Sequence, residues 1–287
     1  MKIENVYNTE LIYDFYKGTD EYSDGDIEEE LLNIVKNNRD YDKIINETDS
    51  FAVFYHLSKN REFITEVMDI SKNDSVLEIG SGCGAITGAL ARDARDVTCI
   101  DLSKRRSLIN AYKNRDNDNV KIYVGNYQDI KLDNRFDVIT LIGVFEYSLY
   151  YMQDDNPFEN MLISCMDKLN ENGRLYIAIE NRLGAKYFSG CREDHVGKAF
   201  VGIEGYPGAI KARTFSYYEL VQMFKKLKLN KYEFYYPYPD YKFPHVVYSD
   251  KYLPVEYENF ECASDYTGIR DRYFDENKFL NSLVGKD

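Results

Sequence analysis

The fold of this chain is decided by one stretch, Val76-Leu77-Glu78-Ile79-Gly80-Ser81-Gly82-Cys83-Gly84-Ala85. An apolar run at Ser75–Ile79 leads into three closely spaced glycines, and a helical pattern follows over 85–92. A strand that turns through glycines into a helix is typical of nucleotide-binding βαβ units. We expect the glycines to be required because a ligand lying against the backbone would collide with a Cβ atom.

The sequence after this loop alternates between short apolar runs and helical patterns, which is typical of a doubly wound parallel sheet. We expect strands at 75–79, 96–100, 120–124, 136–142 and 174–179, with a sixth at 232–236. We expect helices at 85–92, 104–112, 157–169 and 216–227, the last opened by a capping box from Ser216 to Glu219. The predicted fold class is α/β, a Rossmann-like and mainly parallel sheet.

Three domains are expected. Residues 1–70 read as an N-terminal helical cap, with helices near 26–36 and 51–70. Residues 71–240 form the Rossmann-like domain, and 241–287 form a C-terminal extension with a helix at 276–284. No seventh strand is found, so either it is irregular or the chain is part of a longer polypeptide, leading to a further segment or fused domain. The second reading is favoured.

Residues 181–213 interrupt the alternation of strand and helix. Six glycines fall in this range, too many for a regular helix: Gly184, Gly190, Gly197, Gly202, Gly205 and Gly208. A long irregular stretch inside a compact domain is usually functional. We therefore expect a lid or substrate-binding insertion here.

Composition narrows the classes of partner. The chain has 287 residues, a formal net charge of −13 and no cluster of Lys and Arg, so a nucleic-acid partner is not expected. The first ten residues lack the apolar core that a signal peptide would have, and no apolar run is long enough to span a membrane. The five cysteines are odd in number and form no Cys-x-x-Cys pair. We expect a cytoplasmic protein with reduced thiols.

Two carboxylates flank the loop and bear on its ligand. Glu78 precedes the first glycine by two, where it can meet a cationic group, and Asp101 follows the next strand, where it can accept hydrogen bonds from ribose hydroxyls. The loop also fits a dinucleotide pattern, Gly80-x-Gly82-x-x-Ala85. Glu78 weighs against that alternative because it would repel a pyrophosphate at the helix N-terminus.

On these motifs, the chain over about 50–240 resembles the class I S-adenosylmethionine-dependent methyltransferases. The resemblance implies that the glycine loop and Glu78 hold the methionyl part of the cofactor and that Asp101 holds its ribose. It also places the adenine near Asn126 and Tyr127, where Asn126 replaces the more usual Asp. The implied cofactor-binding set is Glu78, Gly80, Ser81, Gly82, Gly84, Asp101, Leu102, Asn126, Tyr127, Gly143 and Arg61. For Arg61 the sequence leaves two readings open, contact with the cofactor carboxylate or a solvated surface position.

Methyl transfer also needs an acceptor site and a base for an acceptor hydroxyl or protonated amine. The carboxyl ends of the strands and the insertion supply five candidates: Glu146, Glu180, Asp194, His195 and Tyr187. Asp194 and His195 are adjacent in sequence, which does not place their side chains face to face. An Asp–His dyad is thus unproven, and His195 is read either as a base or as an ordinary loop residue.

No metal site is predicted. Glu180-Asn181 resembles the acid–amide pair of metal-dependent catechol-type methyltransferases, but these also need an Asp after the fourth strand. This chain has Gly143 and Glu146 there, and a turn or capping role suits Asn181 better.

The segments 179–190, 193–195, 202–205 and 213–216 resemble bacterial methyltransferases that accompany glycosyltransferases in surface-polysaccharide and flagellar-glycan clusters. That resemblance implies a glycan or small-molecule acceptor, O- or N-methylation, and a fused or associated glycosyltransferase. Two rival functions remain, an NAD-type oxidoreductase and a non-catalytic S-adenosylmethionine-binding partner of a glycosyltransferase.

Overall fold

The computed structural model describes residues 2–20, 23, 25–152, 154–208 and 210–254. The described residues up to Val144, together with Leu162–Ala178, form one compact unit. The described residues of Phe145–Met161 and those from Ile179 on form a second unit. The helix expected at 276–284 lies outside the described residues.

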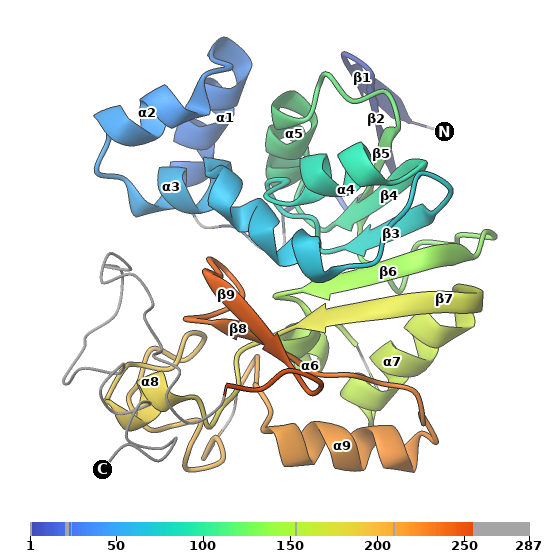
Figure 1. The fold of residues 1–287 in the computed structure, drawn as a ribbon. Helices are drawn as coiled ribbons and strands as arrows, with labels where there is room; N and C mark the ends of the chain where they lie inside the picture. The colour runs from blue at the N-terminus through green and yellow to red at the C-terminus, as the bar shows by residue number, and fades with distance from the viewer. Residues whose placement is uncertain (1, 21–22, 24, 153, 209, 255–287) are drawn as a thin grey trace. The chain divides into compact units, whose positions relative to one another are not determined.

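The first unit is built on a seven-stranded sheet with the order β1-β2-β5-β4-β3-β6-β7 (Figure 1). Its strands are β1 (Ile3–Val6), β2 (Thr9–Phe15), β3 (Ser75–Ile79), β4 (Asp96–Asp101), β5 (Val120–Gly125), β6 (Phe136–Ile142) and β7 (Leu169–Ala178). Every pairing from β2 to β7 is parallel, and only β1 with β2 is antiparallel. The expected α/β fold with a mainly parallel sheet is confirmed.

The sheet order places the glycine loop where the order of the strands reverses. β4 and β5 follow β3 on one side, whereas β6 and β7 lie on the other, so the order reverses at β3. All five residues of β3 are buried, as expected for a central strand covered on both faces. Ligands of open α/β sheets bind outside the carboxyl ends of the strands at this reversal. The loop after β3 begins there.

The N-terminal part differs from its expected all-helical character. β1 and β2 extend the sheet beyond β5, where Leu11 pairs with Ile122 and Ile12 with Tyr123 (Figure 1). The residues of β2 alternate imperfectly between buried and exposed, and Leu11 and Ile12 are both fully buried. Strands of this kind are stabilised by a partner that is distant in sequence, which a local pattern does not reveal.

Helices pack on the sheet and on one another in the first unit. They are α1 (Ile27–Asn37), α2 (Tyr41–Glu47), α3 (Phe51–Leu57), the 3-10 helix η1 (Lys59–Val67), α4 (Thr87–Asp93) and α5 (Lys104–Lys113). The single helix expected at 51–70 is divided at Ser58, whose backbone is extended and whose Oγ accepts from the Asn60 N–H at 3.2 Å. A shared core joins α1, α3, α5 and the loop through Leu31, Leu32, Val35, Val53, Leu57, Cys83 and Ile109.

The second unit is largely irregular. Its elements are η2 (Phe145–Tyr147), α6 (Ser148–Tyr151), α8 (Ala185–Phe188), α9 (Tyr217–Lys226), β8 (Tyr235–Tyr238) and β9 (Val246–Ser249), while α7 (Pro157–Asp167) starts in this unit and ends in the first. The capping box of α9 is confirmed, because Ser216 and Glu219 satisfy each other's backbone N–H groups. The sixth strand expected at 232–236 is wrong as part of the main sheet: β8 pairs with β9 in a separate hairpin.

Candidate active site

The glycine loop connects β3 to α4 through three left-handed residues. Gly80, Gly82 and Gly84 have φ values of +72°, +53° and +75°. The loop is tied to the neighbouring strand because the Gly80 and Ser81 N–H groups both donate to Ile100 O, at 2.8 and 3.1 Å. A side chain at any of the three glycines would strain the backbone.

The space around these glycines gives a second reason for them. A Cβ atom at Gly80 would overlap the Val144 side chain, and one at Gly84 would overlap the Asn110 side chain. At Gly82 the Cβ would meet the Arg106 guanidinium at 3.0 Å. The sequence argument attributed the glycines to a ligand, whereas in the structure the chain's own side chains already occupy the space that each Cβ would need.

Asp101 ends β4 and holds the loop. Its Oδ2 accepts from the Gly82 N–H at 2.7 Å, and its Oδ1 accepts from the Ser103 N–H at 2.9 Å. Burial raises the pKa of Asp101, although Arg106 and these hydrogen bonds oppose that change. Leu102, the next residue, is half-buried. One hydrogen bond per oxygen leaves each carboxylate oxygen a free acceptor position for a ribose hydroxyl.

Glu78 is fully enclosed behind the loop. Its Oε2 accepts from the Thr87 hydroxyl at 2.7 Å and from the Cys99 thiol at 3.3 Å. Burial raises its pKa to about 7, because two neutral donors compensate only part of the lost hydration. Contact with a cationic part of the cofactor stays a prediction, and the structure adds a packing role between α4 and β4.

Arg61 is buried in η1, with an exposed fraction of 5%. Its guanidinium carbon lies 4.5 Å from the centre of the Tyr55 ring, in cation–π geometry. The reading of Arg61 as a solvated surface residue is therefore wrong. Contact with the cofactor carboxylate stays a prediction.

The expected adenine-binding residues and Gly143, also of the expected cofactor-binding set, lie at the ends of β5 and β6. Asn126 Oδ1 accepts from the Gln128 N–H at 3.2 Å, which forms a local turn. The Tyr127 hydroxyl is 2.9 Å from Ser164 Oγ, so that hydroxyl already has a partner within the chain. Gly143 has φ +70° and donates its N–H to Ala178 O at 2.8 Å.

A separate group of side chains in the second unit contains three of the five predicted acceptor-site residues. Glu146 and Glu180 follow β6 and β7 in the chain, and His195 comes from the insertion. His195 Nε2 lies 3.8 Å from Glu146 Oε1 and 3.5 Å from Glu180 Oε2. We call these three residues the acid–histidine group; all three side chains are at least nine-tenths buried.

The other two predicted residues adjoin this group. Asp194 accepts from the Tyr187 hydroxyl and from Lys186 Nζ at 3.1 Å. Lys242 Nζ donates to Glu180 Oε1 and, at 3.3 Å, to Asp194 Oδ1, so one ammonium joins the two carboxylates. The structure thus brings together all five residues that the sequence analysis proposed for the acceptor site.

The histidine has different partners from those weighed in the sequence analysis. Its Nδ1 lies 3.2 Å from the Tyr147 hydroxyl, and its Nε2 faces Glu146 and Glu180. Asp194 is directed to Lys186, Tyr187 and Lys242 instead. His195 therefore faces two glutamates and does not form the Asp194–His195 dyad that the sequence analysis considered.

Burial and charge separate the pKa values of the acid–histidine group. Burial, reinforced by the charge of Glu180, raises the pKa of Glu146 to about 8. Burial also acts to raise the pKa of Glu180, but Lys242 and His195 outweigh it and hold that pKa well below its ordinary value. Burial lowers the pKa of His195, and the two glutamates more than reverse this and raise it. A neutral and an ionised carboxyl group thus lie side by side near pH 7.

Sequence reasoning missed Tyr147, Lys186 and Lys242. Tyr147 directly follows Glu146, and Lys186 directly precedes Tyr187, so proximity to predicted residues was an available signal. Lys242 lies in the C-terminal extension, and no motif surrounds it. Asn181 takes the turn role that was preferred for it, because its Oδ1 accepts from the Leu183 N–H at 2.9 Å.

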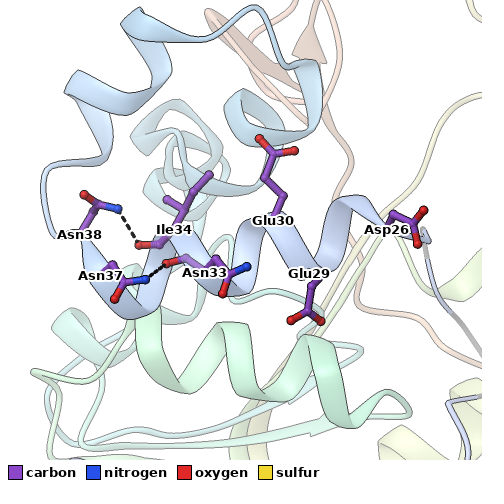
Figure 2. A pocket seen from close by; sticks show the side chains of 7 residues that line it. All are labelled: Asp26, Glu29, Glu30, Asn33, Ile34, Asn37 and Asn38. Atoms are coloured by element: carbon purple, nitrogen blue, oxygen red, sulfur yellow. Dashed lines mark hydrogen bonds between the residues drawn. The ribbon is translucent and has the colours of Figure 1, made fainter.

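A hollow of about 670 Å³ on the first unit is a weaker candidate. Seven residues of α1 and its flanks line it: Asp26, Glu29, Glu30, Asn33, Ile34, Asn37 and Asn38 (Figure 2). Two of the amides are engaged with the helix itself, Asn37 with Asn33 O at 2.9 Å and Asn38 with Ile34 O at 3.2 Å. The lining offers no nucleophile and no buried ionisable group, so we assign it no chemistry.

Known proteins resemble the chain over the region of the glycine loop and sheet. The family described as methyltransferase domain matches residues 77–177. YrhH of Bacillus subtilis strain 168, which is named a methyltransferase, is 31% identical over 140 residues that cover 47% of this chain and 74% of YrhH. The chain belongs to the class I S-adenosylmethionine-dependent methyltransferases. The NAD-type oxidoreductase alternative is thereby set aside.

Other similarities cover less of each relative. Ribosomal RNA small subunit methyltransferase A of Fusobacterium nucleatum is 28% identical over 126 residues, which are 43% of this chain and 44% of that enzyme. The structure of phosphoethanolamine N-methyltransferase 1 from Haemonchus contortus matches with 17% identity and a TM-score of 0.44, covering 68% of this chain and 40% of that one. The chain spans less than half of either protein, so their acceptors are not assigned to it.

S-adenosylmethionine fits the loop of the first unit. Ser81 Oγ is buried and has no hydrogen bond among the described residues, while Asp101 keeps free acceptor positions. Gly80, at the start of the loop, is exposed. For the other residues of the expected cofactor-binding set, contact with the cofactor stays a prediction. None of the helices described is both long and apolar enough to cross a bilayer.

Proposed function

We propose that this methyltransferase modifies a hydroxyl or amine of a glycan-linked or small-molecule acceptor and that the acid–histidine group is its acceptor site. The observation that carries the proposal is the buried assembly of Glu146, Glu180 and His195. Structural acids are rarely buried in such a group, and perturbed pKa values in one place favour a functional site.

When bound, S-adenosylmethionine supplies a methyl group that leaves its sulfonium sulfur and bonds to the acceptor oxygen or nitrogen. Asp101 and the loop glycines would fix the cofactor, and the buried setting of the acid–histidine group would exclude water. The proton of the acceptor must pass to a base of this chain.

Glu146 is the proton acceptor that the electrostatics favour. A pKa of about 8 makes its ionised form a stronger base than an ordinary carboxylate and still accessible near neutral pH. Glu180 is held ionised by Lys242 and is therefore better suited to accept a hydrogen bond or to orient His195. Asp194 and Tyr187 would position Lys242 and Lys186 around these groups.

The glycan acceptor and an associated glycosyltransferase are the finer parts of the proposal. They rest on the resemblance of the insertion to methyltransferases of bacterial surface-polysaccharide and flagellar-glycan clusters. Carboxylates and lysines together also suit a polyhydroxylated acceptor, because they offer both acceptors and donors of hydrogen bonds. A non-catalytic cofactor-binding module is the rival function.

Calorimetric titration tests the cofactor site. We expect S-adenosylmethionine to bind and NAD not to bind, and Asp101→Ala to weaken binding about 10- to 100-fold, since each hydrogen bond to a charged group contributes about 1.5–3 kcal/mol. Asp96→Ala is the matched control, because Asp96 lies at the opposite end of β4 and pairs with Arg95. Equal affinities in wild type and both variants would refute the role of Asp101.

Turnover tests the acceptor site. Candidate glycans and small amines or alcohols are incubated with enzyme and cofactor, and mass spectrometry follows a single methyl increment. We expect Glu146→Gln to lower kcat about 100-fold or more, while the cofactor affinity is retained. A variant with full turnover would exclude Glu146 as the base. Cofactor binding without methylation of any acceptor would favour the non-catalytic alternative.

A further inference from the structure

The acid–histidine group contains three buried atoms that make no hydrogen bond. These atoms are Glu146 Oε2, Glu180 Oε2 and His195 Nε2, and none finds a hydrogen-bond partner among the described residues. The side chains of Glu146 and Glu180 are each 1% exposed, and that of His195 is 9% exposed. Buried polar atoms are almost always satisfied. Here Glu180 Oε2 and His195 Nε2 face each other only at 3.5 Å, and Glu146 Oε2 has no partner among the described residues, which indicates an additional group beside them.

The spacing of the three side chains matches one small cation. One ligand atom from each of the three side chains can be chosen so that all lie within 4.8 Å of one another. Bonds of about 2.0–2.2 Å place opposite ligands of a metal ion up to about 4.4 Å apart. A movement of no more than about 0.7 Å per atom is therefore enough to bring one atom of each side chain into one coordination sphere.

The histidine is held in the orientation that a metal ligand needs. Its Nδ1 contacts the Tyr147 hydroxyl at 3.2 Å, so its Nε2 is directed between the two glutamates. A partner on the second ring nitrogen is characteristic of metal-bound histidines, because it fixes the tautomer and the plane of the ring.

We propose that Glu146, Glu180 and His195 bind one divalent first-row transition-metal ion. A single imidazole with two carboxylates suits Mn²⁺ or Zn²⁺ better than Mg²⁺, which prefers oxygen ligands. The inference deepens the proposed function and rests on it for its catalytic meaning: a cation here would stabilise the anionic form of an acceptor hydroxyl, and with the ion bound Glu146 would act as its ligand and not as a free base. Binding of the ion itself depends only on the second unit.

The test is a titration of the metal-free full-length chain with Mn²⁺, followed by loss of the electron paramagnetic resonance signal of the free ion. We expect one equivalent to bind per chain. Glu180→Gln and His195→Ala should each weaken binding at least about 10-fold. Glu159→Gln is the matched control, because it removes a carboxylate of the same unit that pairs with Lys226. Circular dichroism checks that each variant is folded, and Glu146→Gln serves as a further ligand variant if one is not.

Three outcomes would overturn the cation site: no binding, several weak equivalents, or equal binding in the wild type and the ligand variants. Displacement of Mn²⁺ by Zn²⁺ at one equivalent would support it. Methyl transfer is measured in parallel with and without chelator. Activity that persists without any metal binding defeats the cation site and leaves the proposed function standing. Specific binding of Mn²⁺ with no methylation of any acceptor defeats the proposed function and leaves the cation site.

Discussion

Replacing Glu78 with glutamine is expected to make the stability of the first unit less dependent on pH. Glu78 is buried against neutral donors, the Thr87 hydroxyl and the Cys99 thiol. Burial raises its pKa from the ordinary 4.5 to about 7. The folded state therefore holds this proton more tightly than the unfolded state, and a rise in pH favours unfolding.

The size of the effect follows from that difference in pKa. One pKa unit corresponds to about 1.4 kcal/mol, so the change from 4.5 to about 7 corresponds to about 3 kcal/mol. The stabilising contribution is fully present below about pH 4.5 and is lost as the pH rises through about 7. Glutamine stays neutral and still offers an oxygen to Thr87, so Glu78→Gln should gain about 3 kcal/mol relative to wild type between pH 4.5 and pH 8.

Hydrogen exchange of the β3 and β4 amides measures this change for the first unit alone. Opening free energies of wild type and Glu78→Gln are compared from pH 4.5 to pH 8, each corrected for the intrinsic exchange rate. Glu159→Gln is a control of opposite sign, measured on α9 amides, because Lys226 lowers the pKa of Glu159. A constant difference between wild type and Glu78→Gln over the whole range would refute the reasoning.

Three further predictions concern backbone geometry, capping and a buried histidine. Gly84→Ala should lower the free energy of unfolding by more than about 2 kcal/mol in a thermal melt, since the new side chain combines a positive φ with overlap of Asn110. Gly18→Ala should lower it by only about 1 kcal/mol, because its φ is +94° but its surroundings are open. Ser216→Ala should destabilise α9 by about 1 kcal/mol because the capping box is lost. Amide hydrogen exchange in this helix measures the change, and unchanged protection would contradict the prediction. Burial lowers the pKa of His56 to about 3, so its contribution to stability is present above about pH 6.5 and is lost as the pH falls towards 3. In urea titrations His56→Phe should therefore be less sensitive to acid than the wild type, and equal sensitivity would exclude His56 as a cause.

The sequence was sufficient to predict the parts of the fold that local patterns specify. β3 to β6 and the glycine loop were expected within a residue or two of their observed bounds, because apolar runs and glycines mark them directly. β1 and β2 were missed, since Leu11 and Ile12 are buried through pairing with β5, more than a hundred positions along the chain. β8 was misassigned because its pattern does not reveal that its partner is β9.

The candidate acceptor site shows the same division. Glu146, Glu180 and the insertion residues were predictable because carboxyl ends of parallel strands are where such folds place polar chemistry. Lys242 was not predictable: an isolated lysine in an extension has no spacing that indicates its partners, and only the folded chain brings it to Glu180 and Asp194. The effect of Lys242 on the charge of the site is correspondingly invisible in the sequence.

Three buried glutamates show how the neighbouring groups determine the pKa of one kind of side chain. Glu78 has only neutral donors, so burial dominates and its pKa rises to about 7. Glu180 is equally buried, but the Lys242 ammonium holds it ionised. Glu146 is buried beside that fixed charge, and its pKa rises to about 8, so it can take up and release a proton near neutral pH. Lys242→Met should therefore move Glu180 and Glu146 towards competing for one proton, and the pH profile of methyl transfer should change its shape while cofactor affinity stays the same. A profile identical to that of the wild type would show that Lys242 does not set the charge of the acid–histidine group.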